Sequence, residues 1–158
     1  VAIPLLTLDA SLKLQNNTEE RIVPVCDFFI GPGKTLLKSH EMLTEIIIPI
    51  QNWNTSFIKL GRRNTFTLSM VSLGVALQTE ANTINKVRIA VGAVAPIPMR
   101  ARETEAVLQG RELNVDTIKQ AAQTIEKEVK PITDVRCCLE YRKDMASELL
   151  EKILKNLM

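Results

Sequence analysis

The chain has 158 residues, of which 46% are hydrophobic, and its 20 lysines and arginines against 18 aspartates and glutamates give a net charge of +2. This length suits one domain, or a small domain with part of another, and the composition is that of a globular protein. The near balance of charge argues against nucleic acid as a partner, and no apolar run approaches the roughly 20 residues of a membrane-spanning helix.

The chain starts with Val1 and runs into the apolar stretch Ala2 to Leu8 without a polar lead-in. We interpret this stretch as a strand with an open edge, which would seek a missing partner segment or self-associate. No basic segment followed by an apolar core marks a secretory signal. The three cysteines, two of them adjacent at positions 137 and 138, show no C-x-x-C spacing. We therefore expect reduced, buried thiols in a cytoplasmic protein that has no membrane partner.

The first fifty residues are predicted to be strands joined by turns. Ser11 to Gln15 alternates polar and apolar residues, Arg21 to Val25 is again extended, and Gly31-Pro32-Gly33 is a strong turn signal. Leu43 to Pro49 is rich in β-branched residues, and its run of isoleucines predicts a buried strand that ends at Pro49.

A change of pattern places the domain boundary in the polar stretch at residues 51–55, so we expect one domain over residues 1–53 and a second over residues 54–158. In the second domain, large and small residues alternate from Val71 to Gln78 and again from Val87 to Gly92. Two such strands pair as a hairpin, with the turn near residues 81–83. The small residues on one face permit a helix or another backbone to approach closely.

Three helices are predicted to follow the hairpin. A short helix from Arg102 to Gln109 ends at Gly110, Asn114 caps a second that Pro131 stops, and a third runs from about Leu139 to the end. Strands followed by helices predict an α+β fold. We expect part of a β-sheet domain, then a three-stranded antiparallel sheet packed with helices, its strands centred near Lys59, Leu73 and Ile89.

No complete active site is visible in the sequence. Gly33-Lys34-Thr35 lacks the upstream glycine of a P-loop, because Phe28 stands in its place, and His40 has no identifiable catalytic partner. Metal ligands at a useful spacing are absent as well. Any catalysis therefore depends on a bound cofactor or on another chain.

Two charged clusters are the remaining candidates. Lys59-Leu60-Gly61-Arg62-Arg63 places three cations where a strand leads into a loop, a pattern that suits either an anion site or a solvated strand edge. The alternating charges of Asp134-Val135-Arg136 and Glu140-Tyr141-Arg142 stand before and within the start of the last predicted helix. We interpret the second cluster as structural, since such charges usually tie a helix end to its neighbours.

Four segments together resemble the flavoprotein subunit of the molybdenum hydroxylases, the family of xanthine dehydrogenase and carbon monoxide dehydrogenase. They occur in the family's order and span nearly the whole chain. The segments are Phe28-Phe29-Ile30-Gly31-Pro32-Gly33-Lys34-Thr35 with Glu41 and Ile46-Ile47-Ile48-Pro49; Phe57-Ile58-Lys59-Leu60-Gly61-Arg62-Arg63 with Ser69 and Val71; Arg88-Ile89-Ala90-Val91-Gly92-Ala93-Val94-Ala95-Pro96 with Pro98 and Arg100-Ala101; and Asp134-Val135-Arg136 with Glu140-Tyr141-Arg142-Lys143.

The resemblance implies FAD as the cofactor, with Leu43 near the isoalloxazine ring and Lys59 on the polar side of that ring. It also implies that Arg62 and Arg63 lie on a loop that shapes the field near the flavin. In such enzymes a molybdopterin subunit oxidises the substrate, iron-sulfur clusters relay the electrons to FAD, and the flavin passes them to NAD+ or another acceptor. The family's glycine-rich loops that hold the pyrophosphate lie upstream of any residue in this chain.

The expected partners are therefore the missing N-terminal half of the FAD domain, an iron-sulfur subunit and a molybdopterin subunit. We expect a flavoprotein-subunit fragment of an oxidoreductase that has little activity on its own. The alternatives are a docking module that keeps the fold without holding FAD, and a remnant without activity. Lys59 together with Leu43 favours the first interpretation, because a pure scaffold needs neither.

Overall fold

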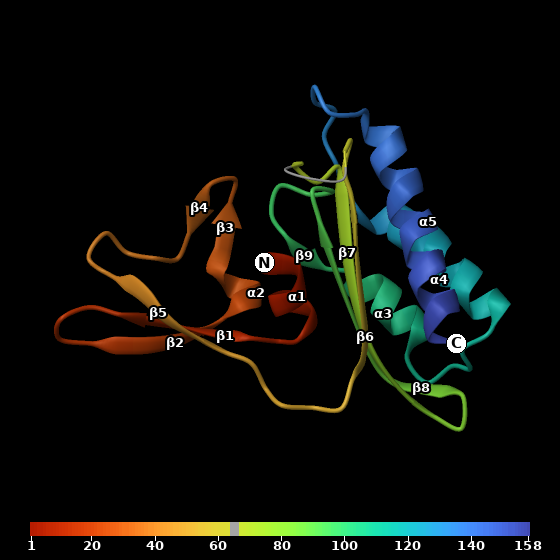
Figure 1. The fold of residues 1–158 in the computed structure, drawn as a ribbon, viewed down its shortest axis with the longest axis horizontal. Helices are drawn as coiled ribbons and strands as arrows, with labels where there is room; N and C mark the ends of the chain where they lie inside the picture. Colours follow the sequence, from red (N-terminus) through yellow and green to blue (C-terminus); the bar gives the residue numbers. More distant parts are fainter. Residues whose placement is uncertain (64–66) are drawn as a thin grey trace.

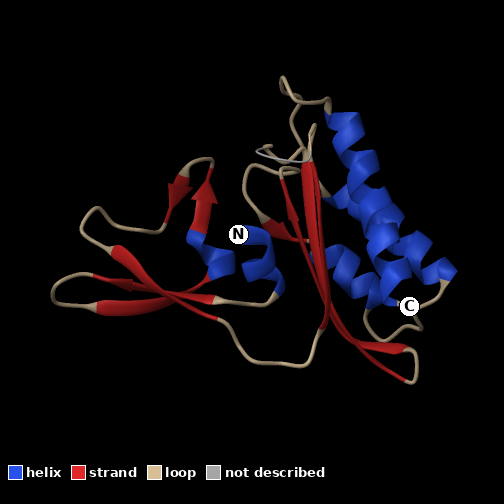
Figure 2. Ribbon diagram, viewed as in Figure 1, coloured by secondary structure: helices blue, strands red, loops and turns tan. Residues whose placement is uncertain are grey.

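A computed structural model describes residues 1–63 and 67–158, whose strands form a three-stranded, a two-stranded and a four-stranded sheet (Figure 1, Figure 2). The smaller sheet has the order β2-β1-β5 and lies beside a two-stranded hairpin. The larger sheet has the order β6-β7-β8-β9 and carries the long helices on one face. None of the helices among the described residues is long and apolar enough to cross a membrane.

The first part of the chain, up to residue 47, contains two short helices besides its strands. Its elements are α1 (Ala2–Thr7), β1 (Ser11–Gln15), β2 (Glu20–Pro24), α2 (Val25–Phe28), β3 (Phe29–Gly31), β4 (Lys34–Thr35) and β5 (Met42–Ile47). All neighbouring strands here are antiparallel. The expected turn at Gly31-Pro32-Gly33 joins β3 to β4, and Gly33 has a φ of 68°, a conformation that glycine adopts without steric cost.

The prediction of a strand from Ala2 to Leu8 was wrong, because Ala2–Thr7 forms the helix α1. Pro4 is compatible with this helix because it lies in the first turn, where its missing N–H costs no intrahelical hydrogen bond. The helix buries Ile3, Leu6 and Thr7. Ile3 and Leu6 belong to a small core with residues of β1, β2 and α2. The apolar stretch is therefore covered by the chain itself and leaves no open strand edge.

The prediction for the isoleucine run was right about the strand and wrong about its burial. Every residue of β5 is exposed, and Ile46, Ile47 and Ile48 keep 45%, 40% and 45% of their surface accessible. The strand ends at Ile47, two residues before Pro49. β5 pairs with β1 on one side only, so its outer edge and much of its apolar surface face away from the described chain.

The antiparallel sheet predicted for the second part is confirmed. Its elements are β6 (Asn54–Leu60), β7 (Val71–Glu80), β8 (Thr83–Gly92) and the short β9 (Met99–Arg100), which adds a fourth strand to the three expected. The turn between β7 and β8 lies at Ala81 and Asn82, both with positive φ. Asparagine is one of the few residues other than glycine that adopt this conformation readily.

The two faces of the large sheet differ as the alternation predicts. The large side chains of β7 and β8 pack under α3 (Arg102–Leu108), α4 (Val115–Glu128) and α5 (Leu139–Leu157) in the main core. Asn114 caps α4 by accepting a hydrogen bond from the Thr117 N–H at 2.9 Å. On the opposite face, α1 lies against Gly74 and Gly92, where an added Cβ atom would stand 2.6 Å from Thr7 Oγ1 and 2.7 Å from Ile3 Cδ1. The small residues therefore permit the close approach of this helix.

Charged groups reinforce this contact between the two parts of the chain. Asp9, which follows α1 and has a φ of 58°, forms ion pairs with Arg88 on β8 at 3.2 Å and with Arg100 on β9 at 3.8 Å. The Arg88 guanidinium also lies over the Trp53 ring, 4.8 Å from its centroid. The polar stretch before β6 is thus fixed against the large sheet.

The cysteines are free, as expected, but they are not buried. Cys26 and Cys138 are exposed and Cys137 is half-buried. Cys26 lies in the one-turn helix α2, whose buried residues are Val25 and Phe28.

Candidate functional site

Strand β6 presents two candidate binding residues on one face. Ile58 and Leu60 turn toward the helix-covered core, so Phe57 and Lys59 turn toward the opposite face, where α1 packs. Phe57 keeps 49% of its surface exposed. Lys59 Nζ donates a hydrogen bond of 3.2 Å to the carbonyl oxygen of Thr67, which holds the ammonium group at the end of the strand. An exposed aromatic ring and a positioned cation thus share one side of β6.

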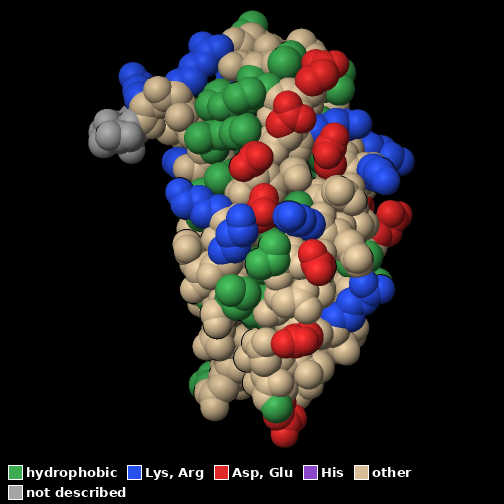
Figure 3. All heavy atoms as spheres, turned by 90° about the vertical axis from the view of Figure 1, so that its right-hand side faces the viewer, with side chains coloured by type: hydrophobic (Ala, Val, Ile, Leu, Met, Phe, Trp, Pro, Cys, Tyr) green, Lys and Arg blue, Asp and Glu red, His purple; other side chains and the backbone are tan. Residues whose placement is uncertain are grey.

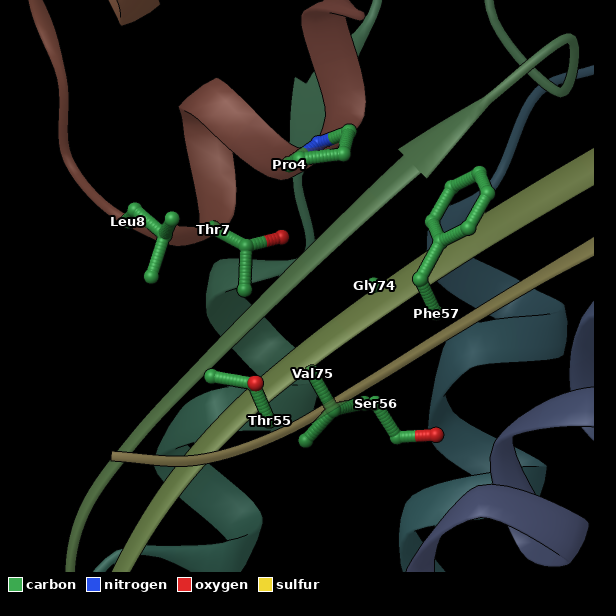
Figure 4. A pocket seen from close by; sticks show the side chains of 8 residues that line it. All are labelled: Pro4, Thr7, Leu8, Thr55, Ser56, Phe57, Gly74 and Val75. Carbon is green, nitrogen blue, oxygen red and sulfur yellow. The ribbon is translucent and has the colours of Figure 1, made fainter.

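A hollow of about 160 Å³ opens beside Phe57 (Figure 4). The Phe57 ring and Pro4 of α1 stand across from each other, and the bare backbone of Gly74 lies between them. The residues that line it are Pro4, Thr7, Leu8, Thr55, Ser56, Phe57, Gly74 and Val75. Because Gly74 has no side chain, the hollow reaches the sheet surface. Sequence reasoning singled out Lys59 on this strand and missed Phe57 and the hollow.

Leu43 lies apart from this hollow, in a different sheet. It is on β5, pairs with Leu14 of β1 and keeps 36% of its surface exposed. The pairing of β1 with β5 shifts register between Lys13 and Leu14. Leu43 and Lys59 thus face solvent from the edge strands of two different sheets.

Arg62 connects the end of β6 to the segment before α5. Its Nη2 atom donates hydrogen bonds of 2.7 Å to the carbonyl oxygens of Val135 and Arg136. Asp134 accepts hydrogen bonds from Arg136 at 2.5 Å and 2.8 Å and from the buried Arg142 at 2.8 Å. These hydrogen bonds hold the pKa of Asp134 well below its usual range, so it stays ionised.

Arg142 supports the interpretation of this charged cluster as structural. Only 2% of its surface is exposed, and its Nη1 atom donates to the carbonyl oxygens of Met70 and Ala93. A buried guanidinium with acceptors on three separate segments fixes the start of α5 against β7 and the loop after β8. The sequence showed the two charged segments, but the connection to Arg62 joins residues far apart in the chain.

The other sequence candidates lie outside this region. His40 is exposed and lies in the loop before β5. Gly33-Lys34-Thr35 leads from a tight turn into β4, with no helix after it, so it lacks the strand-to-helix geometry of a P-loop. Among the described residues no group of three histidine, cysteine, aspartate or glutamate side chains could hold a metal ion.

Glu41, in the loop before β5, is a carboxylate with a strongly lowered pKa. It accepts hydrogen bonds from Arg21 Nε and Nη2 at 2.8 Å and 2.9 Å, and from the Lys38 N–H at 2.9 Å. The Arg21 pair, followed by the backbone bond, lowers the pKa of Glu41 to about 2. The pair ties β2 to the loop before β5 and supplies no group that could act as an acid or base near neutral pH.

These residues fit one part of a flat aromatic ligand with a polar edge. The Phe57 ring and the hollow offer apolar contact, and Lys59 offers a positive charge two residues along the same strand. They do not fit a diphosphate, which requires successive backbone N–H groups pointing at the ligand. Among the residues that the structure describes, the turn with two glycines, Gly31-Pro32-Gly33, contains a proline without an N–H group.

Comparison with known proteins gives two family matches along the chain. Residues 56–157 match the CO dehydrogenase flavoprotein C-terminal domain, and residues 1–51 match the FAD binding domain in molybdopterin dehydrogenase. The glyceraldehyde dehydrogenase medium chain of Sulfolobus acidocaldarius is 29% identical over 153 residues, covering 97% of this chain and 54% of that protein. The xanthine dehydrogenase FAD-binding subunit of Escherichia coli O157:H7 is 26% identical over 156 residues, covering 97% and 53%.

Solved structures show the same arrangement. A carbon monoxide dehydrogenase from Hydrogenophaga pseudoflava superposes with a TM-score of 0.91 and 27% identity, over 96% of this chain and 53% of that chain. Quinoline 2-oxidoreductase from Pseudomonas putida 86 superposes with a TM-score of 0.90 at 23% identity, which shows the shared fold. The chain spans about half the length of the curated relatives it matches.

Proposed function

The chain belongs to the family of CO dehydrogenase flavoprotein C-terminal domains, and we propose that it forms part of the FAD-bearing subunit of a molybdenum hydroxylase. In this role it helps to pass electrons from iron-sulfur clusters through FAD to NAD+ or another acceptor. The observation that carries the proposal is the pair of flavoprotein family matches, which follow one another and together occupy almost all of the chain. A cytoplasmic location belongs to the same proposal and is supported by the three free cysteines.

FAD is the proposed cofactor, with Lys59 and Leu43 as its contacts in this chain. When bound, the flavin supplies the redox chemistry. Lys59 offers its charge to the polar edge of the ring, and Phe57 with the hollow offers apolar contact. Leu43 lies in the other sheet, so the two proposed contacts come from different sheets. We propose that the isoalloxazine ring lies near Leu43, with Lys59 on the polar side of the ring.

We propose that the two domains on either side of the predicted boundary have different roles. Residues 1–53 contribute to the FAD-binding domain, and residues 54–158 form the flavoprotein C-terminal domain. The exposed apolar strand β5 supports a further contact, because its free edge and its isoleucines offer a surface to additional polypeptide. We propose that the segment corresponding to the rest of the relatives' FAD-binding domain covers it. An iron-sulfur subunit and a molybdopterin subunit complete the enzyme.

Co-expression tests this function directly. The chain is produced together with a tagged polypeptide that corresponds to the unmatched half of a relative's flavoprotein subunit. We expect the two to purify as a stoichiometric complex with one FAD per complex, measured by flavin absorbance after denaturation. Co-purification without flavin would favour the alternative, a subunit-docking module that keeps the fold without holding FAD. No co-purification at all would contradict both interpretations.

A further inference from the structure

A second hollow, of about 370 Å³, lies on the β8–β9 side of the large sheet, where α3 begins. Four of the nine described residues that line it are cationic, namely Lys86, Arg88, Arg100 and Arg102, and only Glu105 is acidic. On the side of α4 and α5, by contrast, acidic and basic side chains lie interspersed over much of the surface (Figure 3). A lining in which positive charge predominates suits an anionic ligand.

Two guanidinium groups of this hollow are held in place by their neighbours. The Arg100 side chain is only 6% exposed, and its Nε and Nη2 atoms donate to the two carboxylate oxygens of Glu105 at 2.5 Å and 2.8 Å. The Arg88 guanidinium pairs with Asp9 at 3.2 Å and lies over the Trp53 ring. A cation that is already positioned loses little side-chain entropy when it binds an anion. The two arginines are therefore organised before any ligand arrives.

The arginines of the hollow retain donors for a further acceptor. Glu105 takes up one edge of Arg100, whose Nη1 atom lies 3.8 Å from Asp9 Oδ1, too far for a hydrogen bond. Arg88 Nη1 is buried and has no hydrogen-bond partner among the described residues, which is unfavourable for a donor removed from water. Arg102 Nη1 lies 3.9 Å from Glu105, and the Arg102 side chain is 65% exposed. Each arginine can therefore donate to an anion in the hollow.

The charge of the hollow points to the same kind of ligand. The four cations of the lining carry +4, and the two carboxylates that bind them, Asp9 and Glu105, carry −2, which leaves +2. Like charges this close repel one another, so an additional anion would lower the energy of the cluster. Lys59 lies on β6, at the opposite edge of the same sheet, so the hollow is separate from the proposed flavin contact.

We propose that this hollow binds a phosphate group, either as free phosphate or as part of a small phosphate monoester. The planar fork of a guanidinium matches phosphate oxygens in pairs, and a small turn of the Arg88 guanidinium brings its Nη1 atom to such an oxygen. Trp53 and Ala106 add apolar surface to the lining, which leaves room for an attached organic group. The site does not depend on the function proposed above, since no flavin contact enters the argument.

The test uses the full chain without flavin, and inorganic phosphate and phenyl phosphate as probes. Each is titrated at constant ionic strength, with chloride as the replaced ion, and binding is followed by calorimetry and by the rise in thermal midpoint. We expect saturable binding of both probes and none of phenol. Phenyl phosphate binding about tenfold tighter than phosphate, or more, identifies a site for a phosphate monoester, and equal affinities identify a site for free phosphate.

Variants assign the binding to the hollow. Arg88→Gln and Arg102→Gln should each weaken phosphate binding about tenfold, because each removes a charge-assisted hydrogen bond. Lys119→Gln, which removes the same charge from an exposed position on α4, should leave it unchanged. Since Arg88 also binds Asp9, Arg102→Gln is the decisive variant if Arg88→Gln fails to fold. The proposal is overturned if the parent chain shows no saturable binding, if Arg102→Gln binds as tightly as the parent, or if Lys119→Gln weakens binding as much as Arg102→Gln does.

Discussion

The close packing of α1 on the large sheet makes Gly74 sensitive to a single added methyl group. In Gly74→Ala the new Cβ atom would stand 2.6 Å from Thr7 Oγ1 and 3.2 Å from Ile3 Cγ2. The Thr7 hydroxyl cannot move away freely, because it donates a hydrogen bond of 2.9 Å to the Ile3 carbonyl oxygen within α1. Either this bond breaks or the helix shifts away from β7.

The size of the effect follows from two opposing terms. Replacing glycine by alanine in an ordinary extended backbone stabilises a protein by roughly 0.4–1 kcal/mol, because the unfolded chain loses freedom. Forcing an extra carbon into a packed contact costs about 1–3 kcal/mol. We therefore expect a net loss of about 1–2 kcal/mol, and for a chain of this length each kcal/mol lowers the thermal midpoint by about 2–4 °C.

Urea and thermal unfolding of a double-mutant cycle measure this contact. Thr7→Ala removes the obstructing oxygen, so Thr7→Ala/Gly74→Ala should recover about 1 kcal/mol relative to the sum of the single variants. Gly31→Ala serves as the control, since its added Cβ atom meets nothing closer than 3.9 Å. If Gly74→Ala is as stable as the parent chain, or if the two substitutions are additive, α1 does not pack on β7 as described.

Three further predictions concern the cofactor and the charges. In the complete flavoprotein subunit, Lys59→Ala should weaken flavin binding or shift the flavin potential without changing the unfolding midpoint. An unchanged flavin content and potential would make Lys59 an ordinary surface lysine. Lys86→Ala is the matched control. The chain alone should bind FAD no more tightly than roughly micromolar in a fluorescence titration, because it lacks a pyrophosphate cradle, and stoichiometric nanomolar binding would contradict this. The lowered pKa of Glu41, about 2 against 4.5, contributes stability that is present above pH 4.5 and is lost as the pH falls toward 2. Glu41→Gln should therefore flatten the pH dependence of unfolding in that window, and an unchanged profile would show that the pair with Arg21 is unimportant.

Most of the structure of the second part of the chain could be predicted, because its strands and helix ends are marked by sequence patterns that involve only neighbouring residues. The alternation covers Val71 to Gln78 in β7 and Val87 to Gly92 in β8, and Asn114 and Gly110 mark helix ends through local backbone chemistry. The helix α1 could not be predicted in the same way. Its six residues are too few to show a helical period, and what holds them is packing against other elements, namely the small core of β1, β2 and α2 and the surface of the large sheet.

The candidate site shows the same limit. The sequence marked Lys59 by its charge and by a family resemblance, but the neighbouring hollow arises only where α1 meets β6 and β7. Likewise, the run Lys59-Leu60-Gly61-Arg62-Arg63 looked like one cluster, whereas Arg62 in fact binds the carbonyl oxygens of Val135 and Arg136. Contacts between residues far apart in the chain leave no spacing that a single sequence can reveal. The burial of the isoleucines was misjudged because composition alone does not show which neighbours are present.

The dependence of α1 on the large sheet also has a consequence for the order of folding. A helix of six residues is far below the length that is stable alone in water, because nucleation costs more than so few hydrogen bonds return. Part of its docking surface is formed by the paired strands β7 and β8, which lie far from it along the chain. We therefore expect α1 to become ordered late, after the transition state for folding. Substitutions in α1 should then accelerate unfolding while leaving the folding rate almost unchanged.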